Sequence, residues 1–315
     1  MARKSAVSAR SETSLGKRLR RYWPVYLLAL PAIVYLLINN YGPMFGMVIA
    51  FKNYRFDKGI WGSDWAGLKN FEFLFRSSDS WLITRNTLLY NLTFILLGTV
   101  LSITLAIFLN EIRGKRLRKT YQTVALLPHL LSMVIISYLV YGLLSPGDGL
   151  LNQLMTVLGK PEVSWYDTPE YWPTILILVN QICSVGYLCI VYLSSLAGID
   201  KSYYEAASID GASTWRKIWS ITLPCLKPTI ITMTLLSLGK IMYSDFGLFY
   251  QVPMNSGLLY DVTSTIDTYI YRGLMQSPNL SMSSAAAFYQ SIVGFALVLT
   301  ANFVVSRIDK DSALF

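Results

Sequence analysis

Polar and ionisable side chains interrupt several long apolar stretches of this 315-residue chain. At such positions a polar group costs free energy unless it meets another polar group, water or a bound solute, so each is a candidate binding residue. Tyrosine, asparagine and glutamine combine apolar faces with hydrogen-bonding groups, which suits sugars. The candidates are Tyr90, Asn91, Asn180, Gln181, Tyr187, Tyr192, Lys240, Tyr243, Ser244 and Asp245. For any one of them alone, packing between helices is the commoner role.

The sequence shows no paired acids, nucleophile or metal-ligand constellation of the kind that enzymes use. Its single histidine, His129, lies in an apolar stretch, and its three cysteines include no CxxC pair. We therefore expect no catalytic residue, no metal site and no disulfide. The sequence also lacks the phosphate-binding pattern GxxxxGK[ST], so ATP hydrolysis would have to come from another chain.

The composition indicates a membrane protein, because 53% of the residues are hydrophobic and only 14% are charged. About 20 apolar residues are needed for a helix to cross a bilayer. We predict an all-α integral membrane protein with six transmembrane helices. The predicted spans are residues 23–41, 86–109, 122–144, 172–196, 229–250 and 285–306.

The positive charge is distributed along the chain in a way that sets membrane orientation and does not suggest nucleic-acid binding. Of the 27 Lys and Arg residues, 18 fall in the terminal segments and in the segments after the second and fourth spans. Since cytoplasmic segments carry an excess of Lys and Arg, we predict that both termini are cytoplasmic. Residues 1–22 are interpreted as a basic cytoplasmic tail, and residues 23–315 as the transmembrane domain.

A polar segment at residues 197–228 separates the fourth and fifth spans and is predicted to form two short helices. The signals are a capping box of Ser202 and Glu205, a helix end at Gly211, a cap at Ser213, and breaks at Pro224 and Pro228. The second helix carries Trp215, Ile218 and Trp219 at helical spacing. Such an apolar face docks either on a partner protein or on the lipid surface, and periodicity alone leaves both possibilities open.

The same segment resembles the EAA-loop signature of permease subunits of binding-protein-dependent ABC importers. The matching residues are Glu205, Ala206, Ala207, Gly211, Ile221, Leu223 and Pro224, at the spacing of that signature. The resemblance implies that this loop, with Asp210 and Ala212, forms coupling helices that fit into a cleft on an ATPase subunit. It also implies the permease fold of type I ABC importers.

Other segments resemble the carbohydrate-uptake branch of that family. They are Gly67-Leu68-Lys69-Asn70-Phe71, Asn86-Thr87, Tyr269-Ile270-Tyr271 and, as in subunits for oligosaccharide and polysaccharide uptake, Tyr41–Gly46 followed by Ala50-Phe51-Lys52. One segment departs from the branch, because many sugar permeases have Gly-Gly-Pro after the fifth span. This chain has Val252-Pro253-Met254-Asn255-Ser256-Gly257 there.

The resemblance implies a set of partners in a bacterial cytoplasmic membrane. They are a second permease subunit, two ATPase subunits that bind ATP and Mg, and an extracytoplasmic solute-binding protein that delivers an oligosaccharide or polysaccharide. Two alternatives stay open: a permease for another solute class, and an ion-coupled secondary transporter that uses Lys240 and Asp245. The second leaves the EAA segment unexplained.

Overall fold

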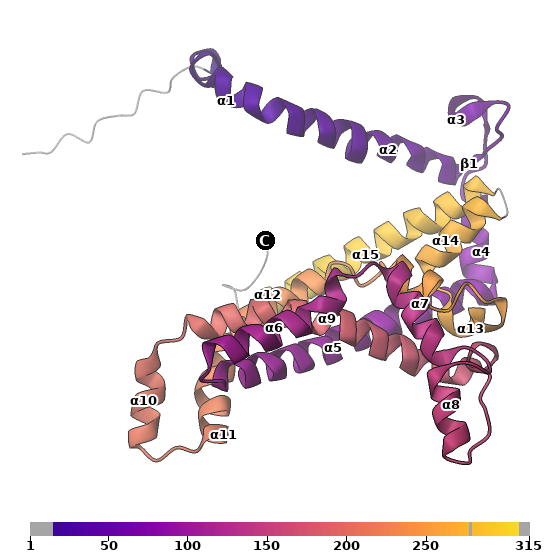
Figure 1. Ribbon diagram of the computed structural model, residues 1–315. Helices are drawn as coiled ribbons and strands as arrows, with labels where there is room; N and C mark the ends of the chain where they lie inside the picture. The colour runs from indigo at the N-terminus through magenta and orange to yellow at the C-terminus, as the bar shows by residue number, and fades with distance from the viewer. Residues whose placement is uncertain (1–14, 277–278, 309–315) are drawn as a thin grey trace, which may run out of the picture.

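The computed structural model describes residues 15–276 and 279–308, and these are almost entirely helical (Figure 1). Residues 1–14 of the predicted tail and Lys310 lie outside the described residues. The longer helices are α1 (Leu15–Leu36), α5 (Ser78–Glu111), α6 (Lys115–Leu130), α7 (Met133–Leu144), α9 (Trp172–Ala197), α12 (Leu223–Leu238), α14 (Ile266–Met275) and α15 (Leu280–Ile308). The short ones are α2 (Gly42–Met44), α3 (Gly59–Gly62), α4 (Glu72–Arg76), α8 (Leu150–Val157), α10 (Lys201–Ile209), α11 (Thr214–Lys217) and α13 (Tyr260–Thr263).

Within the described residues, five helices are long and apolar enough to cross a membrane, and a bent pair makes a possible sixth. The five are Tyr22–Phe51, Ser78–Glu111, Pro169–Ala197, Thr214–Leu238 and Leu280–Arg307. The predicted third span is broken after Leu130, and α6 and α7 meet there at 96°. Ser132 begins α7 by accepting a hydrogen bond from the Ile135 amide, so a polar cap interrupts the apolar run.

The fifth span also differs from the prediction of a helix over 229–250. Its helix ends at Leu238, and an irregular stretch leads to a π-helical turn at Gly247–Gln251. The predicted breaks at Pro224 and Pro228 are wrong, because the helix continues through both residues. A π-helical turn at Ile218–Thr222 precedes Pro224, and the wider turn accommodates a residue that has no amide hydrogen.

Helix α1 stands apart from the other helices in Figure 1. It begins at Leu15, within the segment predicted as a tail, and none of its most apolar window is buried. The chain rejoins the bundle through a 3₁₀ helix at Phe45–Phe51, which packs on α15. There the two-residue strands β1 (Lys52–Asn53) and β2 (Asp64–Trp65) pair antiparallel.

The bundle is held by close contact between α5, α9 and α6. Gly186 of α9 faces the backbone carbonyl of Ala125, and a Cβ at this position would overlap that carbonyl. Small residues let membrane helices approach in this way. Gly186 therefore allows α9 and α6 to pack closely.

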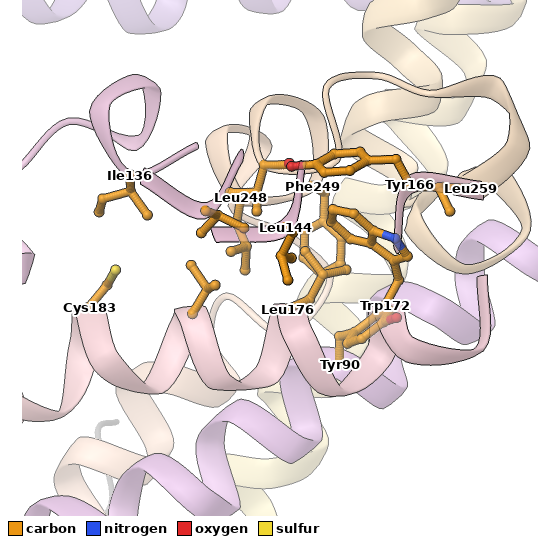
Figure 2. Packing of buried hydrophobic residues seen from close by; sticks show 13 residues of the cluster. Tyr90, Ile136, Leu144, Tyr166, Trp172, Leu176, Cys183, Leu248, Phe249 and Leu259 are labelled. Carbon is orange, nitrogen blue, oxygen red and sulfur yellow. The ribbon is translucent and has the colours of Figure 1, made fainter. Parts of the chain in front are cut away.

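An aromatic core joins the bundle to the loops at one end (Figure 2). Trp172 is fully buried and donates a hydrogen bond from its indole nitrogen to the carbonyl of Trp165 at 2.8 Å. Tyr90 donates to the carbonyl of Val262 at 2.8 Å, and Tyr166 to that of Val252 at 3.3 Å. Burial of the large rings provides apolar stabilisation, while their polar atoms hold the loop backbone in place.

Candidate functional site

Two short helices, α10 and α11, extend away from the bundle as a hairpin (residues 200–222; Figure 1). The predicted capping box of Ser202 and Glu205 is wrong. Asp200 is the cap, and its Oδ1 accepts a hydrogen bond from the Ser202 amide at 2.9 Å. This bond holds the pKa of the Asp200 carboxyl below its ordinary value. The chain turns two residues before Ser202, where an aspartate is already available as a cap.

The predicted helix end at Gly211 is confirmed, because α10 ends at Ile209 and Gly211 has a φ of +73°. A left-handed backbone conformation favours glycine, since a side chain would be strained there. The predicted cap of the second helix is also confirmed: the Ser213 hydroxyl accepts from the Arg216 amide at 3.4 Å. Two side-chain contacts steady the hairpin, Lys217 to Ser208 at 2.7 Å and Tyr204 to Thr222 at 3.0 Å.

The surface of the hairpin is open. The side chains predicted to couple are mostly exposed, namely Glu205, Ala206, Asp210, Gly211 and Pro224, with Ala207, Ala212, Ile221 and Leu223 half-buried. Large apolar side chains are exposed as well: Ile209 is 88% exposed, Trp215 71% and Trp219 67%. Apolar groups gathered in this way mark a surface that another molecule covers.

A cleft of about 700 Å³ separates the hairpin from the end of α5. Its walls carry charges of both signs, which are Glu111, Arg113, Lys201, Glu205 and Lys217. Glu205 forms no ion pair with any residue in the described part of the chain.

Five of the candidate solute-binding residues come together around one cavity of about 240 Å³ between α5, α9 and α12. They are Asn91, Asn180, Tyr192, Lys240 and Tyr243.

The other candidates lie elsewhere. Gln181 is buried where α9 meets Gly98 of α5, and its Nε2 donates to Asn180 at 3.3 Å. Tyr187 stacks on His129 with ring centres 4.6 Å apart, and the His129 ring is 3.1 Å from the carbonyl oxygen of Cys183. Asp245 caps the next turn by accepting from the Leu248 amide.

Ser244 belongs to a group of hydrogen bonds that we call the polar network, formed by Asn91, Ser244, Thr265, Asp267 and Gln290. The carboxylate of Asp267 accepts hydrogen bonds from the backbone amide of Ser244 at 2.7 Å and from the Ser244 hydroxyl at 2.8 Å. It also accepts one from the side-chain Nε2 of Gln290 at 3.1 Å. Gln290 also donates to the carbonyl of Met242 at 2.7 Å, while Asn91 donates to those of Ile241 and Tyr243. Ser244 donates to Thr265 at 2.7 Å.

The polar network explains how a helix can be interrupted at residues 239–246. Backbone groups freed from a helix inside a membrane need partners within the protein, and side chains of α5, α14 and α15 supply them. Sequence reasoning missed Asp267 and Gln290. The only available signal was the polar run Tyr243-Ser244-Asp245 at the end of an apolar stretch.

The segment that departs from the Gly-Gly-Pro pattern forms a tight turn. Met254 and Asn255 have φ values of 52° and 48°. The side-chain oxygen of Asn255 accepts from Arg272 Nε at 3.1 Å and from the Tyr260 hydroxyl at 3.2 Å. Arg272 lies 3.8 Å over the Tyr260 ring, and burial lowers the pKa of its guanidinium. These side-chain hydrogen bonds thus hold Met254 and Asn255 in a backbone conformation that glycine adopts with less strain.

A bundle of apolar helices, interrupted at membrane depth and carrying an exposed helical hairpin, defines a multi-pass membrane permease. The chain belongs to the family of binding-protein-dependent transport system inner membrane components, which residues 98–310 match. Its resemblance to this family is therefore confirmed.

The chain is similar over most of its length to permeases of known systems. It is 32% identical to the polygalacturonan/rhamnogalacturonan transport system permease protein YteP of Bacillus subtilis, over 91% of this chain and 89% of that protein. It is 31% identical to protein LplB of the same organism, over 91% and 90%. It is 28% identical to the sn-glycerol-3-phosphate transport system permease protein UgpA of Yersinia pestis, over 88% and 90%.

Its structure also resembles that of a solved transporter. The match is a chain of a bacterial ABC transporter involved in the import of the acidic polysaccharide alginate, with a TM-score of 0.86, 34% identity and coverage of 94% of this chain and 100% of that chain. A second match, also with a TM-score of 0.86 and 34% identity, is a chain of a bacterial alginate ABC transporter in complex with an alginate pentasaccharide-bound periplasmic protein. The chain therefore has the permease fold of an ABC importer.

Proposed function

We propose that this chain is the permease subunit through which an ABC importer moves an oligosaccharide or polysaccharide across a bacterial cytoplasmic membrane, with both termini in the cytoplasm. An extracytoplasmic binding protein delivers the saccharide, and two ATPase subunits bind and hydrolyse ATP with Mg. The observation that carries this proposal is the exposed hairpin with the EAA signature on a permease fold. The similarity to a polygalacturonan/rhamnogalacturonan permease and to an alginate importer supports a saccharide as the transported solute.

The hairpin would act as the coupling element. Ile209, Trp215 and Trp219 present apolar surface for burial in a cleft of the ATPase, and Glu205 offers a carboxylate to a basic group there. Because Gly211 and the two caps fix the hairpin, movement of the ATPase would be transmitted as movement of a rigid element. The π-helical turn at Ile218–Thr222 connects that element directly to α12.

The isolated position of α1 supports a second permease subunit. The helix is apolar enough to span, yet its own chain leaves it uncovered over its most apolar window. Membrane helices associate by close packing, and a second permease offers the surface that the parent bundle does not. We infer a pairing of two permease chains, probed by the stoichiometry of the purified complex.

The test is to tag the C-terminus, extract the chain gently from its own host and identify the proteins that purify with it. Recovery of an ATPase, a second permease and a binding protein is the expected result. A chain that purifies alone and transports in liposomes without ATP would instead be an ion-coupled transporter, and the proposal would be rejected.

The hairpin gives a second test on the recovered complex. Replacing Glu205 with Gln is expected to reduce ATP-driven uptake while the affinity of the binding protein for its saccharide stays unchanged. Equal uptake by the Glu205→Gln variant and by the unmodified importer would show that Glu205 has no role in coupling.

A further inference from the structure

Lys240 occupies an unusual position at the break in the fifth span. Lys240 lines a cavity between α5 and α9, two helices that are long and apolar enough to cross a membrane. Asn91 of α5 donates a hydrogen bond to the carbonyl of Ile241, the residue after Lys240, at 2.8 Å. This places the ammonium of Lys240 within the membrane-spanning part of the protein, where a cation is costly unless it has a function or a partner.

No carboxylate of the described residues pairs with Lys240. The ion pairs among residues 15–276 and 279–308 are Arg55 with Asp57, Lys58 with Asp64 and Arg76 with Glu72. The acidic residue nearest to Lys240 in the sequence is Asp245, and the acidic residue of the polar network is Asp267. Both carboxylates already accept hydrogen bonds from other groups. Asp245 accepts from the Leu248 amide, and Asp267 accepts from Ser244 and Gln290.

The wall of the cavity that Lys240 lines is largely apolar, with a polar part that includes no acidic side chain among the described residues. The amides of Asn91 and Asn180 and the hydroxyls of Ser237 and Tyr243 share its wall, and Lys240 itself is exposed. Lysine is thus the one charged group of the lining. A cavity with a single positive charge and several hydrogen-bonding groups favours an anionic solute that carries hydroxyls.

We propose that Lys240 binds a carboxylate of the passing saccharide and makes this permease selective for acidic sugars, those with uronic acid units. This inference rests on the proposed function and names its substrate class. Lys240 follows the C-terminus of α12, where the helix dipole favours a cation. The names of two similar proteins, a polygalacturonan permease and an importer of an acidic polysaccharide, agree with a carboxylate.

The experiment compares uptake of two probes by the complete importer, purified with its own partners and reconstituted in liposomes. The probes are trigalacturonate and its fully methyl-esterified form, which has the same backbone but no charge. The variants are Lys240→Met, which keeps the length of the side chain without the charge, and Lys240→Arg, which keeps the charge. Lys160→Met, at an exposed turn far along the chain from the cavity, is the matched control.

Each variant is compared with the unmodified importer for each probe, so any preference of the shared binding protein cancels. We expect Lys240→Met to lower uptake of trigalacturonate about tenfold, the usual effect of losing one charged hydrogen bond, and to leave the ester unchanged. Lys240→Arg should retain most of the uptake, and Lys160→Met all of it. Thermal unfolding of the complex should be the same for all three variants.

Three results would overturn this inference. Lys240→Met could lower uptake of both probes equally, which would show a purely structural role. The importer could hydrolyse ATP yet carry neither probe, so that the substrate class would be wrong while the importer assignment stood. Uptake of sn-glycerol 3-phosphate that depends on Lys240, with no uptake of either saccharide, would assign the cavity to phosphate. Failure of the proposed function itself would show earlier, as the absence of an ATPase in the purified complex.

Discussion

The hairpin and the polar network are two polar regions that the chain builds by opposite means. The hairpin is made from residues close in sequence, its two caps span two and three residues, and its apolar side chains are exposed. The polar network joins residues separated by more than 150 positions, as between Asn91 and Tyr243, and much of it is buried. We infer that the hairpin serves an external partner, whereas the polar network serves the fold.

This comparison predicts different consequences of mutation. Changes in the hairpin should affect uptake and leave the stability of the isolated chain intact. Changes in the polar network should lower that stability first, because groups left without partners in a membrane interior cost free energy.

The largest expected effect is on uptake, from Gly211→Val. A β-branched residue is strained at a φ of +73°, so the hairpin would reverse differently and lose its fit to the ATPase. We expect uptake by the reconstituted importer to be almost abolished. The midpoint of thermal unfolding of the isolated chain should hardly change.

Gly159→Val is the matched control, because Gly159 has a φ of +71° and, like Gly211, open space around it. It introduces the same local strain outside the hairpin and should leave uptake close to normal. If both variants lose uptake equally, backbone strain alone is responsible and the hairpin has no special role.

The second prediction concerns the polar network. Asp267→Ala removes the acceptor for the Ser244 amide and hydroxyl and for Gln290, leaving donors unpaired. We expect a loss of about 2–4 kcal/mol in the free energy of unfolding, from more than one charged hydrogen bond. Asp57→Ala is the control, since its ion pair with Arg55 is exposed and contributes little. Equal melting of the two variants in detergent would contradict a structural role for the network.

The contrast also explains what could be predicted from the sequence. The first, second, fourth and sixth spans follow from runs of apolar residues, and Gly211 and Ser213 act on their nearest neighbours, so these features are predicted correctly. The capping box at Ser202 failed through a shift of two residues, because Asp200 and Ser202 are both good caps and the sequence does not rank them.

The break in the fifth span could not be predicted for a different reason. It depends on Asn91 and Gln290, which donate hydrogen bonds to carbonyls of the irregular stretch at separations of 150 and 48 residues. Hydropathy is averaged over neighbours and does not register such bonds. The clustering of Asn180, Tyr192, Lys240 and Tyr243 follows from the same break, so the candidate residues could be named but not grouped.

A smaller effect is expected for Gln290→Leu. This substitution keeps the size of the side chain but removes the donor to the Met242 carbonyl and to Asp267. Because a buried carbonyl and carboxylate lose one partner each, we expect a loss of about 1–3 kcal/mol in the free energy of unfolding. Gln153→Leu removes an exposed bond to the Asp148 carbonyl and should change it little. If Gln153→Leu lowers the free energy of unfolding as much as Gln290→Leu does, burial of the hydrogen bond does not determine its contribution to stability.

The smallest effect should come from the cap of the hairpin and should depend on pH. The Ser202 amide keeps the pKa of Asp200 below its ordinary 3.8, so the charged cap contributes fully above that value and is lost as the pH falls through the lower folded value. Asp200→Asn keeps an acceptor that does not titrate. We expect amide hydrogen exchange in α10 to be alike in the two proteins at neutral pH and faster in the unmodified protein below the folded pKa of Asp200. If the exchange rates stay equal through that range, the Asp200 carboxylate does not cap α10 in solution, and the short-range bond that begins the hairpin must be reassigned.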